Sequence, residues 1–278
     1  MAHSRHYTHL FSNFSSLQIL ITILFLSGCA TFGLHDDEEQ KQAEILNTQK
    51  SLIISFLNKG LPGIAAKELR VQLKKYPDDP DFKNLMGLTQ LALKNPKRAV
   101  VFFRDALRRK RQPSIALNLS SAYIESGQYQ KAVRTLLDIR KSEEMEDYPH
   151  PERISHNLGL AAERSKKLRR AERYYRRALN DNPRFYISIM RLGQLYDKTK
   201  RPKSARREYK KARAICDFCF DPVNAMTMNY VANGQTRQAM RTLKKWLALK
   251  NISAKDRKRG KKLLKLVQRV GTKTPRAR

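Results

Sequence analysis

The sequence predicts an all-α protein, a right-handed superhelical solenoid of about six two-helix repeats closed by a C-terminal capping helix. A leucine or aromatic residue follows each of a series of small residues by four positions, which places both on one helix face. Successive small residues lie 34, 33, 39, 34 and 34 positions apart. Such a period marks repeat arrays in which each unit buries its apolar face against the next. The small residues are Ala65, Ala99, Ala132, Ala171, Ala205 and Ala239.

Two neighbouring repeats show the internal pattern most clearly. In the first of them, Leu158-Gly159 precedes Ala171-xxx-Tyr175-xx-Ala178, and the next repeat has the same order of residue types. This order and a period of 34 are those of the tetratricopeptide repeat. The small residues let paired helices approach closely, and the larger residue fills the space shared with the next repeat. These larger residues are Leu69, Phe103, Leu136, Tyr175, Tyr209 and Leu243.

Turn signals separate the paired helices and give the order of elements. Glycine and proline are the strongest such signals because they interrupt a helix. The single spacing of 39 falls across Ser142–Pro151, an acidic, proline-rich stretch, and predicts a longer loop between repeats rather than a missing helix. The array is therefore expected to span residues 46–250. The turn signals are Lys59-Gly60, Asn95-Pro96, Ser126-Gly127, Arg201-Pro202 and Asn233-Gly234.

The N-terminus has the composition of a lipoprotein signal peptide, over residues 1–28. An apolar run there ends in Leu26–Cys29 (LSGC), which resembles a bacterial lipobox, in which cleavage before the cysteine lets its thiol carry lipid. A transmembrane anchor is the alternative, but the run is short for a bilayer and acidic residues follow it. Residues 29–45 would then hold the lipidated Cys29 and a polar tether. Ala30 after the cysteine indicates an outer-membrane location facing the periplasm.

The other end of the chain, residues 251–278, is predicted to form a capping helix and a basic tail. Apolar residues lie on one side of a helix over residues 254–270, and a solenoid has to cover its last apolar face. Just before the last repeat, Cys216 and Cys219 leave three states open: a disulfide, free thiols or a metal site. We favour a local disulfide, because an exported protein meets oxidising conditions and zinc would need two further ligands.

The chain is strongly basic, with 57 Lys and Arg against 25 Asp and Glu and a formal net charge of +32. Such a charge attracts anionic partners. Export removes nucleic acid from the expected partners, so a solvated basic surface and contact with anionic lipid or cell wall stay open. Neither a phosphate-binding glycine loop nor a Gly-x-Ser-x-Gly motif occurs. We therefore expect no enzyme activity, no catalytic residue, no metal and no cofactor.

Partners of repeat solenoids bind mainly on the concave face, which the first helices are expected to line. The repeat register places there a set of side chains that is more apolar than charged, which suits an amphipathic helix or an extended peptide. The basic excess lies mostly on the second helices and should face outward. The predicted groove residues are Asn47, Lys50 and Ile54; Asn84 and Leu88; Leu117 and Ser121; His156 and Leu160; Met190 and Gln194; and Asn224 and Met228.

The order of lipobox, short tether, six repeats and terminal cap resembles that of the type IV pilus assembly lipoproteins, the secretin pilotins of the PilF, PilW and Tgl type. The most telling stretch is Tyr148–Arg153 (YPHPER), followed by Asn157–Leu160 (NLGL) and Ala171–Tyr175 (AERYY). The family has a similar loop after its third repeat. Three features depart from the family pattern: Ile53, where glycine is usual, the strong basicity of the chain, and the pair Cys216 and Cys219.

The resemblance implies a protein that binds monomers of the outer-membrane secretin, helps them reach the outer membrane and supports assembly of the secretin ring. Membrane attachment would come from the N-terminal lipid. We expect Ile53, Ile54, Phe56 and Leu57 of the first repeat to contribute to the secretin contact, because the N-terminal end of a solenoid leaves an apolar surface open. The alternative function is a general protein-binding scaffold for another complex of the cell envelope.

Overall fold

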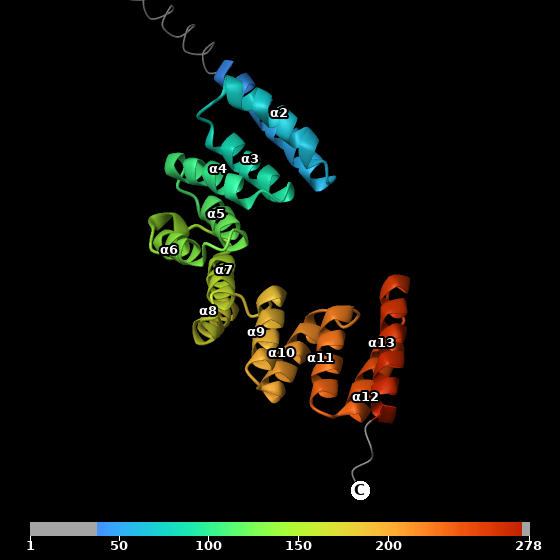
Figure 1. The fold of residues 1–278 in the computed structure, drawn as a ribbon. Coiled ribbons are helices and arrows are strands. Elements are labelled where there is room, and N and C mark those ends of the chain that lie inside the picture. Colours follow the sequence, from blue (N-terminus) through green and yellow to red (C-terminus); the bar gives the residue numbers. More distant parts are fainter. Residues whose placement is uncertain (1–37, 274–278) are drawn as a thin grey trace, which may run out of the picture.

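The computed structural model describes residues 38–273, and in that part of the chain every regular element is a helix. Helices stack in an extended array, from the first hairpin at one end to α13 at the other (Figure 1). The predicted signal peptide, Cys29 and the first part of the tether lie outside the described residues. Within the described residues, no helix is long and apolar enough to cross a membrane.

The helices form six consecutive pairs and a final single helix, which confirms the predicted all-α repeat solenoid. The first pair is the helix over residues 38–58 and α2 (Pro62–Lys75), and the short η1 (Glu143–Met145) lies in the long loop between the third and fourth pairs. The other elements are α3 (Pro80–Ala92) with α4 (Pro96–Arg109), α5 (Pro113–Glu125) with α6 (Tyr129–Ile139), α7 (Pro151–Arg164) with α8 (Leu168–Asp181), α9 (Tyr186–Lys198) with α10 (Pro202–Ile215), α11 (Phe220–Ala232) with α12 (Thr236–Leu247), and α13 (Ala254–Lys273).

The turns inside the repeats depend on one residue in the left-handed region. Gly60, Gly127 and Gly234 have φ values of 70°, 79° and 69°, which glycine adopts at little cost. In the other three repeats a lysine takes this place, and the left-handed conformation costs lysine about 1 kcal/mol more than it costs glycine. The proline signals seen in the sequence lie just after two of these lysines and open the second helix, where the missing N–H costs nothing. The three lysines are Lys94, Lys166 and Lys200, with φ values of 62°, 61° and 58°.

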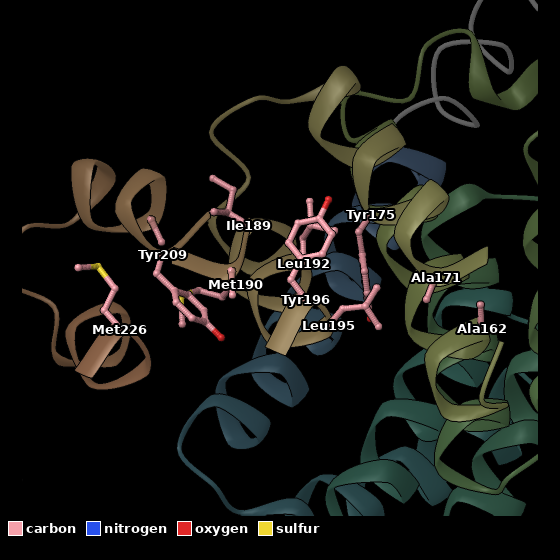
Figure 2. Packing of buried hydrophobic residues seen from close by; sticks show 12 residues of the cluster. Ala162, Ala171, Tyr175, Ile189, Met190, Leu192, Leu195, Tyr196, Tyr209 and Met226 are labelled. Carbon is pink, nitrogen blue, oxygen red and sulfur yellow. The ribbon is translucent and has the colours of Figure 1, made fainter. Parts of the chain in front are cut away.

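The core follows the repeat register. All six small residues that open the second helices are fully buried, and so are five of the six larger residues four positions later, while Tyr209 is 1% exposed. Figure 2 shows one such cluster, in which Tyr175 and Tyr209 pack with Leu192, Tyr196 and neighbouring side chains of the fourth and fifth repeats. Because each large residue packs between two repeats, the same contacts that form a hairpin also join it to the next one.

The first repeat differs from the others in two ways. Its first helix covers residues 38–45, so these residues are helical rather than part of a polar tether. Ile53 occupies the position of the glycines in later repeats and packs against Leu69. In the repeats that have a glycine at this position, an aromatic residue lies against it. Leu69 is smaller than those aromatic residues, so the first repeat has room for the β-branched side chain of Ile53.

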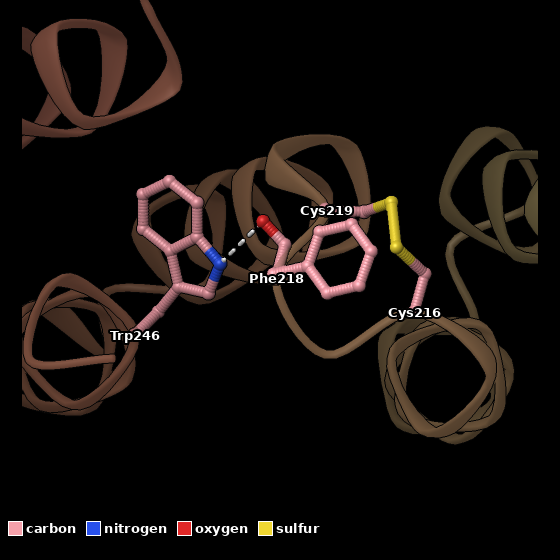
Figure 3. Close-up of a disulfide and its surroundings, with 4 residues drawn as sticks. All are labelled: Cys216, Phe218, Cys219 and Trp246. Carbon is pink, nitrogen blue, oxygen red and sulfur yellow. Dashed lines mark hydrogen bonds between the residues drawn. A yellow bond between two sulfur atoms is a disulfide. The ribbon is translucent and has the colours of Figure 1, made fainter. Parts of the chain in front are cut away.

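The C-terminal end is covered as predicted. Leu263 and Val267 of α13 pack on the buried Trp246 of α12, and Gly260 lets α13 approach the indole ring closely. Next to this cap, Cys216 and Cys219 form a disulfide across the turn between α10 and α11, with their Cα atoms 5.3 Å apart. The Nε1 of Trp246 donates a hydrogen bond to the carbonyl oxygen of Phe218 in the same turn, at 3.2 Å (Figure 3). The disulfide and the cap therefore stabilise one region.

Candidate protein-binding surfaces

The structure buries the predicted groove residues to different extents. Leu117, His156 and Met190 are each less than 10% exposed and belong to the packing between repeats. Little of their surface is free for a partner, which corrects their prediction as open contact residues. The half-buried groove residues are Lys50, Asn84, Leu88, Ser121, Leu160 and Asn224. The exposed ones are Asn47, Ile54, Gln194 and Met228.

A cavity of about 350 Å³ lies on this face, between α5, α7 and α9. Leu117 and His156 line it despite their burial, so both predicted residues contribute to its wall. Tyr148, from the long loop after α6, closes one side, and Phe185 and Ile187 at the start of α9 close another. The remaining lining residues are Ser114, Asn118, Ser121, Arg153 and Asn157.

Side-chain amides and hydroxyls form hydrogen bonds from one first helix to the next along this face. Asn118 Nδ2 donates to Asn84 Oδ1 at 3.0 Å, which links α5 to α3. Asn157 Nδ2 donates to Oγ of both Ser120 and Ser121 at 3.2 Å, which links α7 to α5. Repeat spacing alone did not reveal these contacts, because Asn84 and Asn118 occupy different positions in their repeats.

His156 forms part of the packing of the fourth and fifth repeats. Its Nδ1 is 2.8 Å from Ser188 Oγ, and its ring centroid lies 5.5 Å from that of Tyr175 and 5.6 Å from that of Phe185. Burial, together with the positive charge of Arg191, lowers the pKa of His156 to about 4. The imidazole is therefore neutral at neutral pH and adds a polar but uncharged edge to the cavity.

The N-terminal end of the solenoid presents a second candidate surface, and it corrects part of the predicted contact set. Ile53 is fully buried against Leu69 and cannot contact a partner, while Phe56 and Leu57 are half-buried in the same cluster. Ile54 remains accessible at 44% exposure. The sequence interpretation missed Leu52, which is 43% exposed.

Leu52 is open because no repeat precedes it within the described residues. Its counterparts in the five later repeats are all buried, at 4% exposure or less, where each packs toward the preceding hairpin. The repeat register carries this signal, since Leu52 stands one residue before the position of the glycines. Further exposed apolar residues of the same hairpin are Ile45, Leu61, Ile64 and Val71. The counterparts of Leu52 are Met86, Leu119, Leu158, Leu192 and Met226.

The basic residues of the second helices face outward. Arg104 and Arg108 of α4 and Arg169, Arg173 and Arg177 of α8 are all exposed. Groups of three or more His, Cys, Asp or Glu side chains that could hold a metal ion are absent from residues 38–273. The described chain therefore offers apolar and polar binding surfaces on the concave face and at the N-terminal end, and a basic surface on the convex face.

Comparison with known proteins agrees with this architecture. A family model described as tetratricopeptide repeat matches residues 156–218. The type IV pilus assembly protein PilF of Pseudomonas aeruginosa is 25% identical over 196 residues, which are 69% of this chain and 76% of PilF.

Solved structures show the same relationship. The PilF structure from Pseudomonas aeruginosa superimposes with a TM-score of 0.60 at 19% identity, covering 78% of this chain and 96% of PilF. The crystal structure of PilW, described as a widely conserved type IV pilus biogenesis factor, gives a TM-score of 0.64 at 18% identity over 77% of this chain and 96% of PilW. Residues 156–218 therefore match tetratricopeptide repeats, the chain is similar in sequence to PilF, and it shares the fold of PilF and PilW.

Proposed function

We propose that this chain is a pilotin-type binding protein of type IV pilus biogenesis, which binds secretin subunits and promotes their targeting to, and assembly in, the outer membrane. Its relation to PilF and its likeness to PilW support a role in pilus biogenesis. The observation that best supports binding over catalysis is the number of exposed apolar side chains on the first hairpin, among them Leu52 and Ile54. An exposed apolar patch of this kind favours contact with another protein.

The register indicates what kind of partner element fits this end. In every later repeat, the residue equivalent to Leu52 packs against a preceding helical hairpin. An amphipathic helix of the partner, laid beside the helix over residues 38–58, would cover Leu52 in the same way. The cap α13 covers the other end of the stack, so the two ends of the array are not equivalent.

Lipid on Cys29 would hold this surface close to the membrane. Eight residues, 30–37, lie between Cys29 and the first described helical residue, and the nine Cα–Cα steps that join them reach about 30 Å at most. Anchoring within that distance raises the effective concentration of the binding surface toward secretin subunits that arrive at the membrane. We propose the outer membrane, facing the periplasm, as the location, and the lipid as the membrane attachment.

The test measures heat-resistant secretin multimers and monomers in outer membranes of cells with and without the gene. We expect multimers to disappear in the deletion strain while monomer persists. Cys29→Ala should mislocalise the monomer, and Leu52→Glu should reduce multimers although the chain still folds. Val101→Glu is the matched control, because Val101 is an equally exposed apolar residue on α4, away from the N-terminal end. Unchanged multimers in the deletion strain would contradict the proposal.

A second candidate function is an envelope scaffold that contacts anionic lipid or cell wall. The exposed basic side chains of the second helices favour it, since several of them have no recorded ion pair among residues 38–273. Salt-sensitive binding to vesicles with anionic lipid, lost when these side chains are neutralised, would support this function. The residues are Lys67, Arg70, Arg134, Arg173, Lys210 and Arg241.

A further inference from the structure

The concave-face cavity between α5, α7 and α9 combines apolar walls with amides, hydroxyls and one arginine. Its apolar lining comes from Leu117, Phe185 and Ile187, and the ring of Tyr148 adds a wall from the loop after α6. Tyr148 packs on the core of the third and fourth repeats, so the loop is fixed in place at this point. Tyr148 therefore encloses the cavity on one side.

Two amides in this cavity are oriented by their neighbours. Asn118 is held through its Nδ2 by Asn84, and Asn157 through its Nδ2 by two serine hydroxyls. These bonds use the N–H groups and leave the carbonyl oxygen of each side chain as an acceptor. Acceptors on adjacent first helices suit the backbone N–H groups of an extended segment that crosses α5 and α7.

The lining of the cavity carries charge of one sign. Arg153 is the charged side chain of the lining, which contains no Asp or Glu, and His156 is neutral at neutral pH. Arg153 is exposed, lies beside Tyr148, and forms no ion pair within the described part of the chain. Behind the lining, Arg191 on α9 adds positive potential close to His156, and Glu163, which is paired with Lys198, adds negative potential. A carboxylate that enters the cavity would meet a guanidinium without having to displace another acid.

We propose that this cavity binds an Asp or Glu side chain carried within an extended segment of the protein partner, an inference that rests on the proposed protein-binding function. Arg153 donates charge-assisted hydrogen bonds to the carboxylate. Asn118 and Asn157 accept backbone N–H groups on either side of it, and the apolar walls contact the neighbouring aliphatic groups. The first turn of α7, which carries Arg153, and Tyr148 of the preceding loop thus contribute specificity.

The experiment uses fluorescein-labelled nonapeptide pools with blocked ends and random Ala, Ser, Thr and Val around one central residue. That residue is Glu, Gln, Lys or Leu, and one further Gln pool has a free C-terminal carboxylate. Fluorescence anisotropy with the folded chain should give about tenfold tighter binding of the Glu pool than of the Gln pool. Arg153→Gln should reduce this preference to less than about twofold, whereas Asn157→Ala should weaken all pools alike. Arg104→Gln, at an exposed arginine of α4, is the matched control and should change nothing.

Equal binding of the Glu and Gln pools, or a preference that survives Arg153→Gln, would overturn the inference. Stronger binding of the free-carboxylate pool than of the Glu pool would overturn it in favour of chain-end recognition. A failure of the pilotin proposal can be distinguished from a failure of the cavity proposal. If the Glu preference holds while secretin multimers are unaffected in the deletion strain, the cavity inference stands and the partner is another protein.

Discussion

Gly159 on α7 lies directly against the ring of Tyr175 on α8: a Cβ added to the glycine would be 2.6 Å from Cδ1 and Cε1 of the ring. The ring is fully buried, and its hydroxyl donates a hydrogen bond to Glu163 at 2.7 Å. Such a distance is shorter than any ordinary carbon–carbon contact, so no other residue fits without movement of the ring. The pair fixes how closely the two helices of the fourth repeat approach.

The first prediction follows from this contact. Gly159→Ala should lower the free energy of unfolding by about 1–3 kcal/mol, because the methyl group overlaps the ring and the helices must separate. Urea unfolding followed by circular dichroism measures the change. Gly63→Ala is the control, since no atom lies within 4 Å of a Cβ placed there, and it should be neutral or stabilise by about 0.5–1 kcal/mol. Equal effects of the two substitutions would contradict the steric explanation.

The second prediction concerns pH. Burial first, and Arg191 second, lower the pKa of His156 from 6.5 to about 4 in the folded chain. Between these values the unfolded chain binds the proton more readily, so the contribution of His156 is complete above pH 6.5 and is lost as the pH falls toward 4. The loss should reach about 3 kcal/mol. Urea unfolding at several pH values from 7 to 4 tests this.

His156→Gln is the control for the pH experiment, because it retains a polar side chain but cannot titrate. The difference in unfolding free energy between the two proteins should change with pH over the range from 6.5 to 4 and stay constant above it. A difference that is constant over the whole range would show that His156 does not titrate with a lowered pKa.

The third prediction concerns the disulfide. Replacing Cys216 and Cys219 together by alanine should reduce the free energy of unfolding by about 2 kcal/mol, which is the chain-entropy value for so short a loop. Trp246 is the single tryptophan of the chain and bonds to the turn that the disulfide closes, so its fluorescence reports unfolding of this end. A reducing agent should have the same effect on the unsubstituted chain and none on the double variant.

The fourth prediction compares Leu52 with its counterpart Leu192. Leu192→Ala should cost about 2–5 kcal/mol, because it removes a side chain that is 2% exposed from the core between two repeats. Leu52→Ala should cost less than about 1 kcal/mol, since the side chain is partly solvated already. A large loss at Leu52 in the isolated chain would mean that the first hairpin is covered by another part of the same protein.

The repeat part of the fold was predictable because the signal is distributed over many positions. Six small residues at a nearly constant spacing, each followed by a large one, permit few arrangements other than stacked helical hairpins. The candidate site was less predictable. The register predicts which residues line the concave face. It cannot show that Met190 is covered or that Asn118 and Asn157 are held by residues of neighbouring helices, because those contacts depend on how far each hairpin rotates against the next.

By itself, the sequence determined the helical class, the number and order of the repeats, the long loop before α7 and the need for a terminal cap. These follow from local periodicity and from side-chain size, which act within a few helical turns. Tertiary structure alone decided which apolar residues of the first repeat remain open. Ile53 and Leu52 are neighbours of similar hydrophobicity, but Ile53 faces its own hairpin and Leu52 faces the side that, in each later repeat, the preceding hairpin covers. Leu52 is more exposed because its hairpin is the first in the described stack, and a pattern of nearby residues does not show where a stack ends.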